Sequence, residues 1–319
     1  MLGSSAACVL LATSGPVRPQ AWPQRRVRII LPFPLGGNSD FMLRIVADRL
    51  TQRLGQAFII ESRPGAAGAL AAELVARAEP DGHTLLMGSP SQISITPLIT
   101  KTAYDPVADF APISVIGTNP KVWAVPADLP VETFGQFVDY ARARPDQLAY
   151  ADAGAGSIAH LSTALVLQRT GMRMFRVSYK GNAPSTTDLV AGRVATSFTN
   201  LSVVLPYFLD HSLKLLAVAD DRRSPQLPAV PTFAEAGFPG IVIHTWNGLM
   251  APAGTPRPIV DQLASEVARA VKDPAIAERL VSNGVDPLGN TPDEFAALIK
   301  ADIALWAEAI KSAGIQANN

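Results

Sequence analysis

Residues 150–160, "YADAGAGSIAH", combine a β-rich run, a glycine turn and the start of a helical pattern. A strand that leads into a helix through such a turn is the building unit of α/β folds. Residues 154–159 also fit the G-x-G-x-x-G/A pattern of dinucleotide-binding proteins. That pattern needs an acidic residue about 20 positions later to hold the ribose, and no Asp or Glu occurs between Asp152 and Asp188. The turn is therefore predicted to hold something smaller than a dinucleotide.

A second turn of the same form, "FPLGGNSD", occurs at residues 33–40. The helical pattern that follows it has Asn38 or Ser39 as its predicted N-cap and Gly55 just past its end. Around both turns, strand and helical patterns alternate in two series along the chain. This alternation predicts parallel strands joined by right-handed crossovers.

Three capped helical patterns follow at the end of the chain, and a tail of that length cannot bury its apolar faces alone. We expect it to pack back on the first series, so that the chain crosses between two units near residues 119–126 and 243–248. Two crossings make a hinge. The sequence thus predicts the α/β class with two lobes, each a sheet flanked by helices. The expected boundaries are 22–122 and 246–319 for lobe I, and 123–245 for lobe II.

Composition excludes several classes of function. The 319 residues carry a formal net charge of zero and no basic run, so no electrostatic footprint for nucleic acid or an anionic membrane is present. No apolar run reaches the roughly 20 residues that a membrane helix needs. Cys8 is the only cysteine, which excludes a disulfide framework and a cysteine-ligated metal site.

The first 21 residues are predicted to form an export signal of atypical composition. "AACVLLA" at 6–12 is a short apolar region, and Ala21 fits the end of a cleavage region. No Lys or Arg precedes the apolar region, and Arg18 and Pro19 lie near the cleavage point. A truncated or mis-started signal is the favoured interpretation, and a disordered cytoplasmic leader is the alternative.

Both glycine turns offer backbone N–H groups at the start of a helix, where the helix dipole adds partial positive charge. Such a site suits one carboxylate, and in α/β sheets ligands bind where these turns lie, beyond the carboxyl ends of the strands. The alternative is an ordinary capped turn, with Asp40 serving the helix start and Asn200 shaping a turn. Lys180 is another candidate for attracting an anion, although a solvated lysine explains it more simply.

Catalysis finds little support in the sequence. The four histidines show no metal-binding spacing, and neither a G-x-S-x-G elbow nor a phosphate-binding loop occurs. Ser157 and His160 lie three residues apart but have no acidic residue nearby in sequence to orient them, so local helix capping is the better account. We therefore expect no catalytic residue, no metal and no cofactor. An α/β enzyme acting on a carboxylate remains the rival class.

The segments together resemble the Bug-type periplasmic solute-binding receptors of tripartite tricarboxylate transporters. The resemblance runs from Trp22 to Ile315 and rests on "RIILPFPLGGNSD", "ESRPGAAGALAAELVARAEPDGHTLLMGS", "YDPVADFAPIS", "YADAGAGSIAH", "SYKGNAPSTTDLVAGRV", "RSPQLPAVPTFAEAGFPG" and "WNGLMAPAGTP". It implies a monomeric, type II-like Venus flytrap in the periplasm that delivers a small carboxylate to membrane permease subunits. The implied ligand site comprises Phe33, Gly37, Ser39, Asp40, Ser89, Ser91, Ala155, Gly156, Ser157, Thr199 and Asn200.

Three departures from the family pattern bear on the ligand. Leu35 stands where the family often has a second proline, and "ADAGAG" at 151–156 replaces the commoner "ASSGNG". The second change removes a hydroxyl and an amide from the turn. Asn200 lies near the place where amino-acid-binding members carry an Asp, which argues against an α-amino acid ligand. A sensor that signals to a partner protein is a further alternative to transport.

Overall fold

The computed structural model describes residues 22–154, 157–224 and 226–312. The strands are β1 (Val27–Leu31), β2 (Phe58–Ser62), β3 (Thr84–Gly88), β4 (Phe110–Pro126), β5 (Ala149–Asp152), β6 (Phe175–Ser178), β7 (Thr196–Asn200), β8 (Leu213–Val218), β9 (His244–Pro252) and β10 (Asp286–Pro287). The α-helices are α1 (Asn38–Leu54), α2 (Ala69–Ala76), α3 (Thr96–Ile99), α4 (Phe134–Arg142), α5 (Ile158–Thr170), α6 (Asn182–Val190), α7 (Leu201–Leu209), α8 (Arg257–Lys272), α9 (Pro274–Val281) and α10 (Pro292–Ser312). A 3₁₀ helix, η1 (Ala66–Gly68), and a π-helix, η2 (Ser91–Ile95), are also present. The predicted export signal, residues 1–21, lies outside the described residues.

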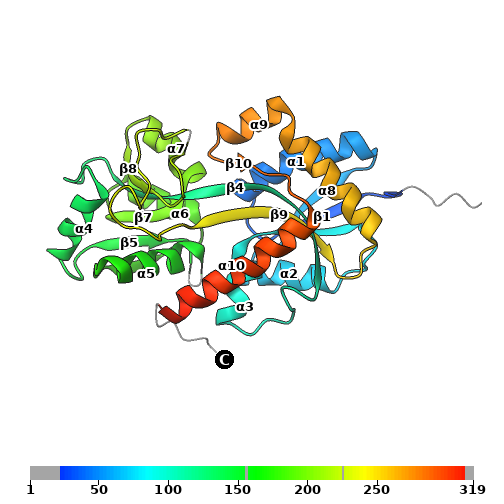
Figure 1. Cartoon of the computed structure of the whole chain (residues 1–319), viewed down its shortest axis with the longest axis horizontal. Coiled ribbons are helices and arrows are strands. Elements are labelled where there is room, and N and C mark those ends of the chain that lie inside the picture. Colours follow the sequence, from blue (N-terminus) through cyan, green and yellow to red (C-terminus); the bar gives the residue numbers. More distant parts are fainter. Residues whose placement is uncertain (1–21, 155–156, 225, 313–319) are drawn as a thin grey trace, which may run out of the picture.

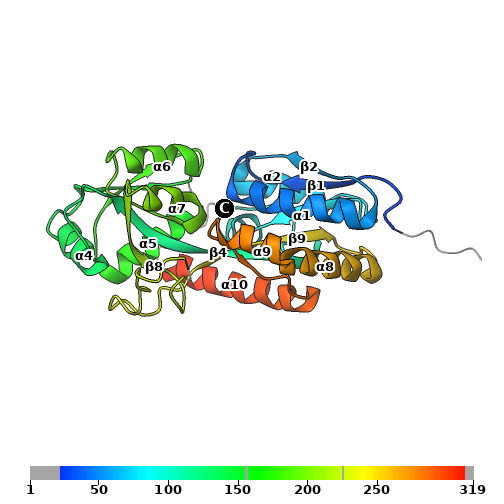
Figure 2. The ribbon, with the colours of Figure 1, turned by 90° about the horizontal axis from the view of Figure 1, so that it is seen from above.

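The strands form a mixed sheet in the order β2-β1-β3-β9-β4-β7-β5-β6, with β8 and β10 also paired to β4. β1 pairs in parallel with β2 and β3, and β5 pairs in parallel with β6 and β7. The alternation of strands and helices in the sequence therefore predicted the parallel pairs correctly. The class is α/β, and the two lobes lie side by side in Figures 1 and 2.

Two long antiparallel strands carry the sheet from one lobe to the other. β4 pairs with β9 over most of its length and then with β7 and β8, while β9 also pairs with β3. Figure 1 shows β4 and β9 running together between the lobes. The predicted crossings, near residues 119–126 and 243–248, lie on these strands except for residue 243, which precedes β9. There Asn119 pairs with Thr245 and Pro120 with His244.

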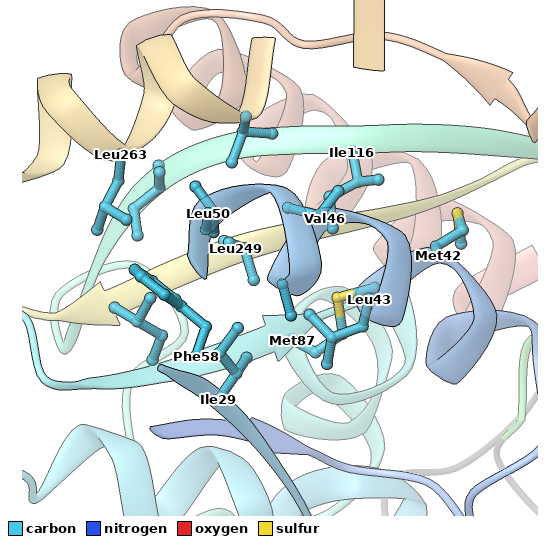
Figure 3. Close-up of a cluster of buried hydrophobic side chains, with 14 of the residues drawn as sticks. Ile29, Met42, Leu43, Val46, Leu50, Phe58, Met87, Ile116, Leu249 and Leu263 are labelled. Carbon is cyan, nitrogen blue, oxygen red and sulfur yellow. The ribbon is translucent and has the colours of Figure 1, made fainter. Parts of the chain in front are cut away.

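The core of lobe I explains why α1 forms where it does. Met42, Leu43, Val46 and Leu50 recur at helical spacing and are fully buried in one cluster with side chains of the sheet and of α8 (Figure 3). Each such aliphatic side chain contributes about 1.5–3 kcal/mol on burial. Gly55 ends the helix in the left-handed conformation, with φ at 71°, as the sequence predicts.

The start of α1 lies one or two residues before the predicted position. Its N-cap is Gly37, which lacks a side chain, and Asn38 is already the first helical residue. The predicted N-cap residues Asn38 and Ser39 were therefore wrong, because the side chain of Ser39 makes a long-range contact instead. In α5 the predicted cap is confirmed, since the Ser157 side chain accepts a hydrogen bond from the backbone N–H of His160.

The C-terminal helix α10 packs on both lobes. Its first half belongs to lobe I, where Phe295 and Ile299 join the cluster around Trp246. Its second half belongs to lobe II, where Trp306 and Ile310 are buried in the same cluster as the phenylalanines of α4. The expectation that the tail packs on the first lobe therefore holds only for part of it. The other boundaries of the two lobes remain predictions.

Asp302 ties this helix to a strand between the lobes. Its two carboxylate oxygens accept hydrogen bonds from the indole N–H groups of Trp246 on β9 and Trp306 on α10, each at 3.0 Å.

Within the described part of the chain, no helix is both long and apolar enough to cross a bilayer.

Candidate functional site

The turn before α5 is held in shape by its own backbone and by Ser157. Gly154 has a φ of +126°, a conformation that side chains with a Cβ rarely adopt. Its carbonyl accepts a hydrogen bond from the Ser157 N–H at 3.1 Å. The Ser157 hydroxyl then accepts the His160 N–H at 3.2 Å. Two predicted ligand residues of this turn, Ala155 and Gly156, lie outside the described residues.

Asp152 supports the turn from inside the lobe. Its side chain is completely buried, and Oδ1 accepts hydrogen bonds from the Gly154 N–H at 2.8 Å and the Ser178 hydroxyl at 2.9 Å. Nε of Arg176 lies 3.1 Å from Oδ2, an ion pair whose alignment does not make a hydrogen bond. The role of Asp152 in the turn could not be predicted from "ADAGAG", because its partners Arg176 and Ser178 lie on the next strand, β6.

His160 faces the guanidinium of Arg176. Its Nε2 lies 2.9 Å from Nη1 of Arg176, and its pKa is lowered by burial and by that charge. The imidazole therefore favours its neutral form. Because the Ser157 hydroxyl accepts the backbone N–H of His160, the contact between these two residues is the predicted helix cap.

The turn before α1 uses the same device as the turn before α5. Asp40 is buried, and its Oδ2 accepts hydrogen bonds from the Gly36 N–H at 2.9 Å and from Nε of Arg44 at 3.0 Å. Gly36 has a φ of +85°. In both turns, a buried aspartate thus fixes the N–H of a glycine with positive φ in the turn that precedes a helix. The contacts of Asp40 agree with the capping interpretation of this residue.

Strand β9 connects the predicted site residues of the two lobes. Ser39, at the start of α1, donates a 2.7 Å hydrogen bond to Oδ1 of Asn247. Asn200, at the end of β7, accepts a 3.2 Å hydrogen bond from the hydroxyl of Thr245. Thr245 and Asn247 are two residues apart on one strand, so their side chains project from the same face. Trp246 lies between them and points to the other face, where its ring packs edge-to-face on that of Phe295. The two ring centroids are 5.1 Å apart.

These β9 residues were missed by the sequence analysis. Asn247 is 1% exposed and Thr245 5% exposed, so both are buried polar groups with their partners far away in sequence. On β4, Asn119 adds a third polar contact, a 2.9 Å hydrogen bond to the Ser202 hydroxyl. The "WNG" segment drew attention only as a family motif, and nothing in it indicated these pairings.

The remaining predicted residues are engaged within their own lobes. Ser89 donates to Oε1 of Gln92 at 2.6 Å, and Ser91 donates to the Ala67 carbonyl at 3.0 Å. Thr199 is buried on β7. Phe33 is half-buried, and its carbonyl accepts a 2.8 Å hydrogen bond from Ser62. Gly37 precedes α1, and its carbonyl accepts a 3.0 Å hydrogen bond from the backbone N–H of Phe41.

Comparison with known proteins identifies relatives over nearly the whole chain. The model of the tripartite tricarboxylate transporter family receptor matches residues 42–315. Protein BugT of Bordetella pertussis is 34% identical over 314 residues, which cover 96% of this chain and 95% of that protein.

Two solved structures with the same fold are described as containing a bound carboxylate. The structure of R. palustris Rpa4515 with adipate is 38% identical, with a TM-score of 0.88, and covers 93% of this chain and 99% of that one. MatC from Rhodopseudomonas palustris with bound malate is 32% identical, with a TM-score of 0.83, and covers 91% of this chain and 100% of that one.

Proposed function

This chain belongs to the receptor family of the tripartite tricarboxylate transporters, and on that premise we propose that it captures a small carboxylate between its two lobes. The family assignment confirms the resemblance to Bug-type receptors that the sequence motifs indicate. The proposal includes delivery of the ligand to membrane permease subunits in the periplasm, by a monomeric receptor without enzymatic activity.

One observation carries the proposal: each lobe presents a glycine turn that a buried aspartate holds at the start of a helix. Such turns present backbone N–H groups and the positive end of a helix dipole, which bind carboxylates without a charged side chain. The hydrogen bonds to β9 support the idea that both turns bind one ligand. Ser39 of lobe I bonds to Asn247 and Asn200 of lobe II bonds to Thr245, which is two residues away on the same strand. The relatives with adipate and malate support the same ligand class.

Thermal denaturation against mono-, di- and tricarboxylates, amino acids and aromatic acids tests this proposal. A ligand at 100 times its Kd adds about 2.7 kcal/mol to stability, which raises the Tm by a few degrees. A selective shift for one class of carboxylate, with the compound recovered unchanged, supports the receptor. Chemical conversion of the compound would favour the enzyme, and no shift with any carboxylate would contradict carboxylate capture.

Transport and sensing share the capture step, so the thermal assay does not separate them. Deleting the gene and measuring uptake of the labelled carboxylate by whole cells does so. Loss of uptake supports delivery to a permease. Normal uptake combined with a lost transcriptional response to the carboxylate would favour the sensor.

Alanine at Ser157 is expected to weaken carboxylate binding by about 0.5–1.5 kcal/mol, the value of one neutral hydrogen bond. The hydroxyl caps α5, so its loss loosens the helix start at which we propose that the carboxylate binds. Isothermal titration calorimetry of the wild type, Ser157→Ala and Ser157→Thr measures the effect. Threonine keeps the hydroxyl and should bind close to the wild type, whereas equal affinity of all three proteins would remove Ser157 from the site.

A further inference from the structure

Lys121 is a buried lysine whose ammonium has no acidic partner among the residues that the structure describes. It lies on β4, is 2% exposed, and sits opposite Asn200 in the β4–β7 register. Its Nζ lies 5.4 Å from the centroid of the Phe198 ring. Over the described ranges of the chain, Nζ takes part in no hydrogen bond or ion pair. Burial alone lowers the pKa of Lys121 to about 7.

A buried lysine without a counter-charge is rare because desolvating an ammonium is costly. The ring of Phe198 offsets only a small part of that cost. An apolar side chain of similar length would fill the same space at no such cost. The lysine therefore calls for a reason beyond packing, and buried titratable groups without partners are characteristic of functional sites.

Lys121 lies on the same face of the lobe II sheet as helix α5, whose preceding turn is the proposed carboxylate site. Lys121, Trp123 and Phe198 project from one face of the lobe II sheet, since Trp123 is two residues along β4 and pairs with Phe198. Trp123, Phe198 and Ile158, the first residue of α5, are buried in one cluster. Lys121 thus lies on the face of the sheet that α5 covers.

The distance across the sheet is suited to a short ligand. The strand order is β4-β7-β5, and the turn before α5 follows β5 directly. Two strand spacings amount to about 10 Å. A flexible lysine side chain and a dicarboxylate of four to six carbons together span such a distance. Asn200 lies at the end of β7, the strand between β4 and β5. It accepts the hydrogen bond from Thr245 of β9 that links the two lobes.

We propose that the ammonium of Lys121 binds a second carboxylate of the ligand, which makes this receptor selective for dicarboxylates. The inference rests on the proposed function, because it takes the first carboxylate to bind at the turn before α5. Lys121 is then a specificity-determining residue. The turn before α5 binds any carboxylate, and the ammonium of Lys121 raises the affinity for ligands with a second negative charge. The partly exposed Asn200 stands beside it as a hydrogen-bond partner for the same group.

Matched pairs of ligands test this inference. Isothermal titration calorimetry at pH 7 compares adipate with hexanoate and succinate with butanoate, for the wild type, Lys121→Met and Lys121→Gln. We expect the wild type to prefer at least one dicarboxylate over its partner by 10-fold or more. Both variants should lose that preference through weaker dicarboxylate binding, with monocarboxylate affinity unchanged within about twofold.

Lys214→Met is the matched control for loss of a lysine. Lys214 lies on β8 of the same lobe, but its ammonium is satisfied by the Leu129 carbonyl at 2.7 Å and by Glu132 at 2.9 Å. Its replacement should leave the preference for dicarboxylates intact.

The possible failures are distinguishable. A wild type that binds carboxylates without preferring a dicarboxylate overturns the role of Lys121 and leaves the proposed function standing, and this result needs no variant to fold. Full dicarboxylate affinity in Lys121→Met does the same. A wild type that binds none of the four acids, nor any other carboxylate of the thermal panel, overturns the proposed function as well.

Discussion

The Lys121→Met protein without ligand is expected to be more stable than the wild type, by up to about 4 kcal/mol at pH 7. The folded protein lowers the pKa of this ammonium from 10.5 to about 7 because the side chain is buried. The unfolded chain restores the ordinary pKa and binds a proton that the folded chain holds weakly. Methionine removes that difference and keeps a flexible side chain of similar length, at the loss of a weak contact with the Phe198 ring.

The pH dependence has a definite sign. Between pH 7 and 10.5 the unfolded chain holds the proton and the folded chain has released it, so the stability of the wild type rises with pH across this window. The advantage of Lys121→Met is therefore greatest at pH 7 and below, and it disappears by about pH 10.5. Urea denaturation of both proteins at pH 6, 8 and 10 measures it. Equal stability at every pH would contradict the burial of an unpaired ammonium, and Lys214→Met controls for losing any lysine.

This stabilisation and the proposed binding role oppose each other. A residue that destabilises the empty protein and strengthens the liganded one follows the usual trade-off between stability and activity. If Lys121→Met is more stable but binds dicarboxylates as well as the wild type, the ammonium is a structural burden and not a ligand partner. The two measurements together therefore assign the lysine to one role or the other.

The second large effect is expected for Asp152→Ala, which should lose about 2–4 kcal/mol of stability. The substitution removes a buried acceptor from the Gly154 N–H and from Ser178, and it leaves Arg176 without its ion pair. Arg176 is one-third exposed and can rehydrate, which places the loss below that of a fully buried pair. Carboxylate affinity should fall about 10-fold, or 1.4 kcal/mol, because the turn before α5 loses the group that fixes it.

Asp152→Asn separates the two functions of this side chain. The amide keeps an oxygen for the Gly154 N–H, so the turn and the affinity should be largely retained, while the ion pair with Arg176 is lost. Asp261→Ala removes an exposed carboxylate paired with Arg257 and should stay within about 0.5 kcal/mol of the wild type. Urea denaturation and calorimetric titration of the three variants test this, and an Asp152→Ala protein with unchanged affinity would show that the turn holds its shape alone.

Local patterns predicted what local forces determine. The spacing of Leu43, Val46 and Leu50 placed α1, and the glycine turn placed the start of α5 with Ser157 as its cap, because helix periodicity and capping involve neighbours in the chain. The parallel pairs followed from the alternation of strands and helices.

The features that sequence alone did not predict depend on distant partners. Ser39 was expected to cap α1, yet its partner Asn247 lies 208 residues away. The burial of Lys121 arises from the neighbouring strand β7, and Asp152 acquires its role from residues on β6. The second half of α10 was assigned to lobe I but packs in the core of lobe II, since an amphipathic pattern shows that a helix has an apolar face without showing what covers it.

The packing of α10 has a consequence for how the protein unfolds. Trp306 and Ile310 complete the core of lobe II, although the chain reaches them only after lobe I has been finished. Lobe II therefore lacks its full core without α10, whose first half packs in lobe I. Asp302 adds a contact shared by Trp246 on β9 and Trp306 on α10. Two domains joined only by a linker melt independently, whereas domains that share a structural element lose their folded state together. We expect one cooperative transition in calorimetry, so that a ligand held by the turn in lobe II raises the melting temperature of the whole molecule.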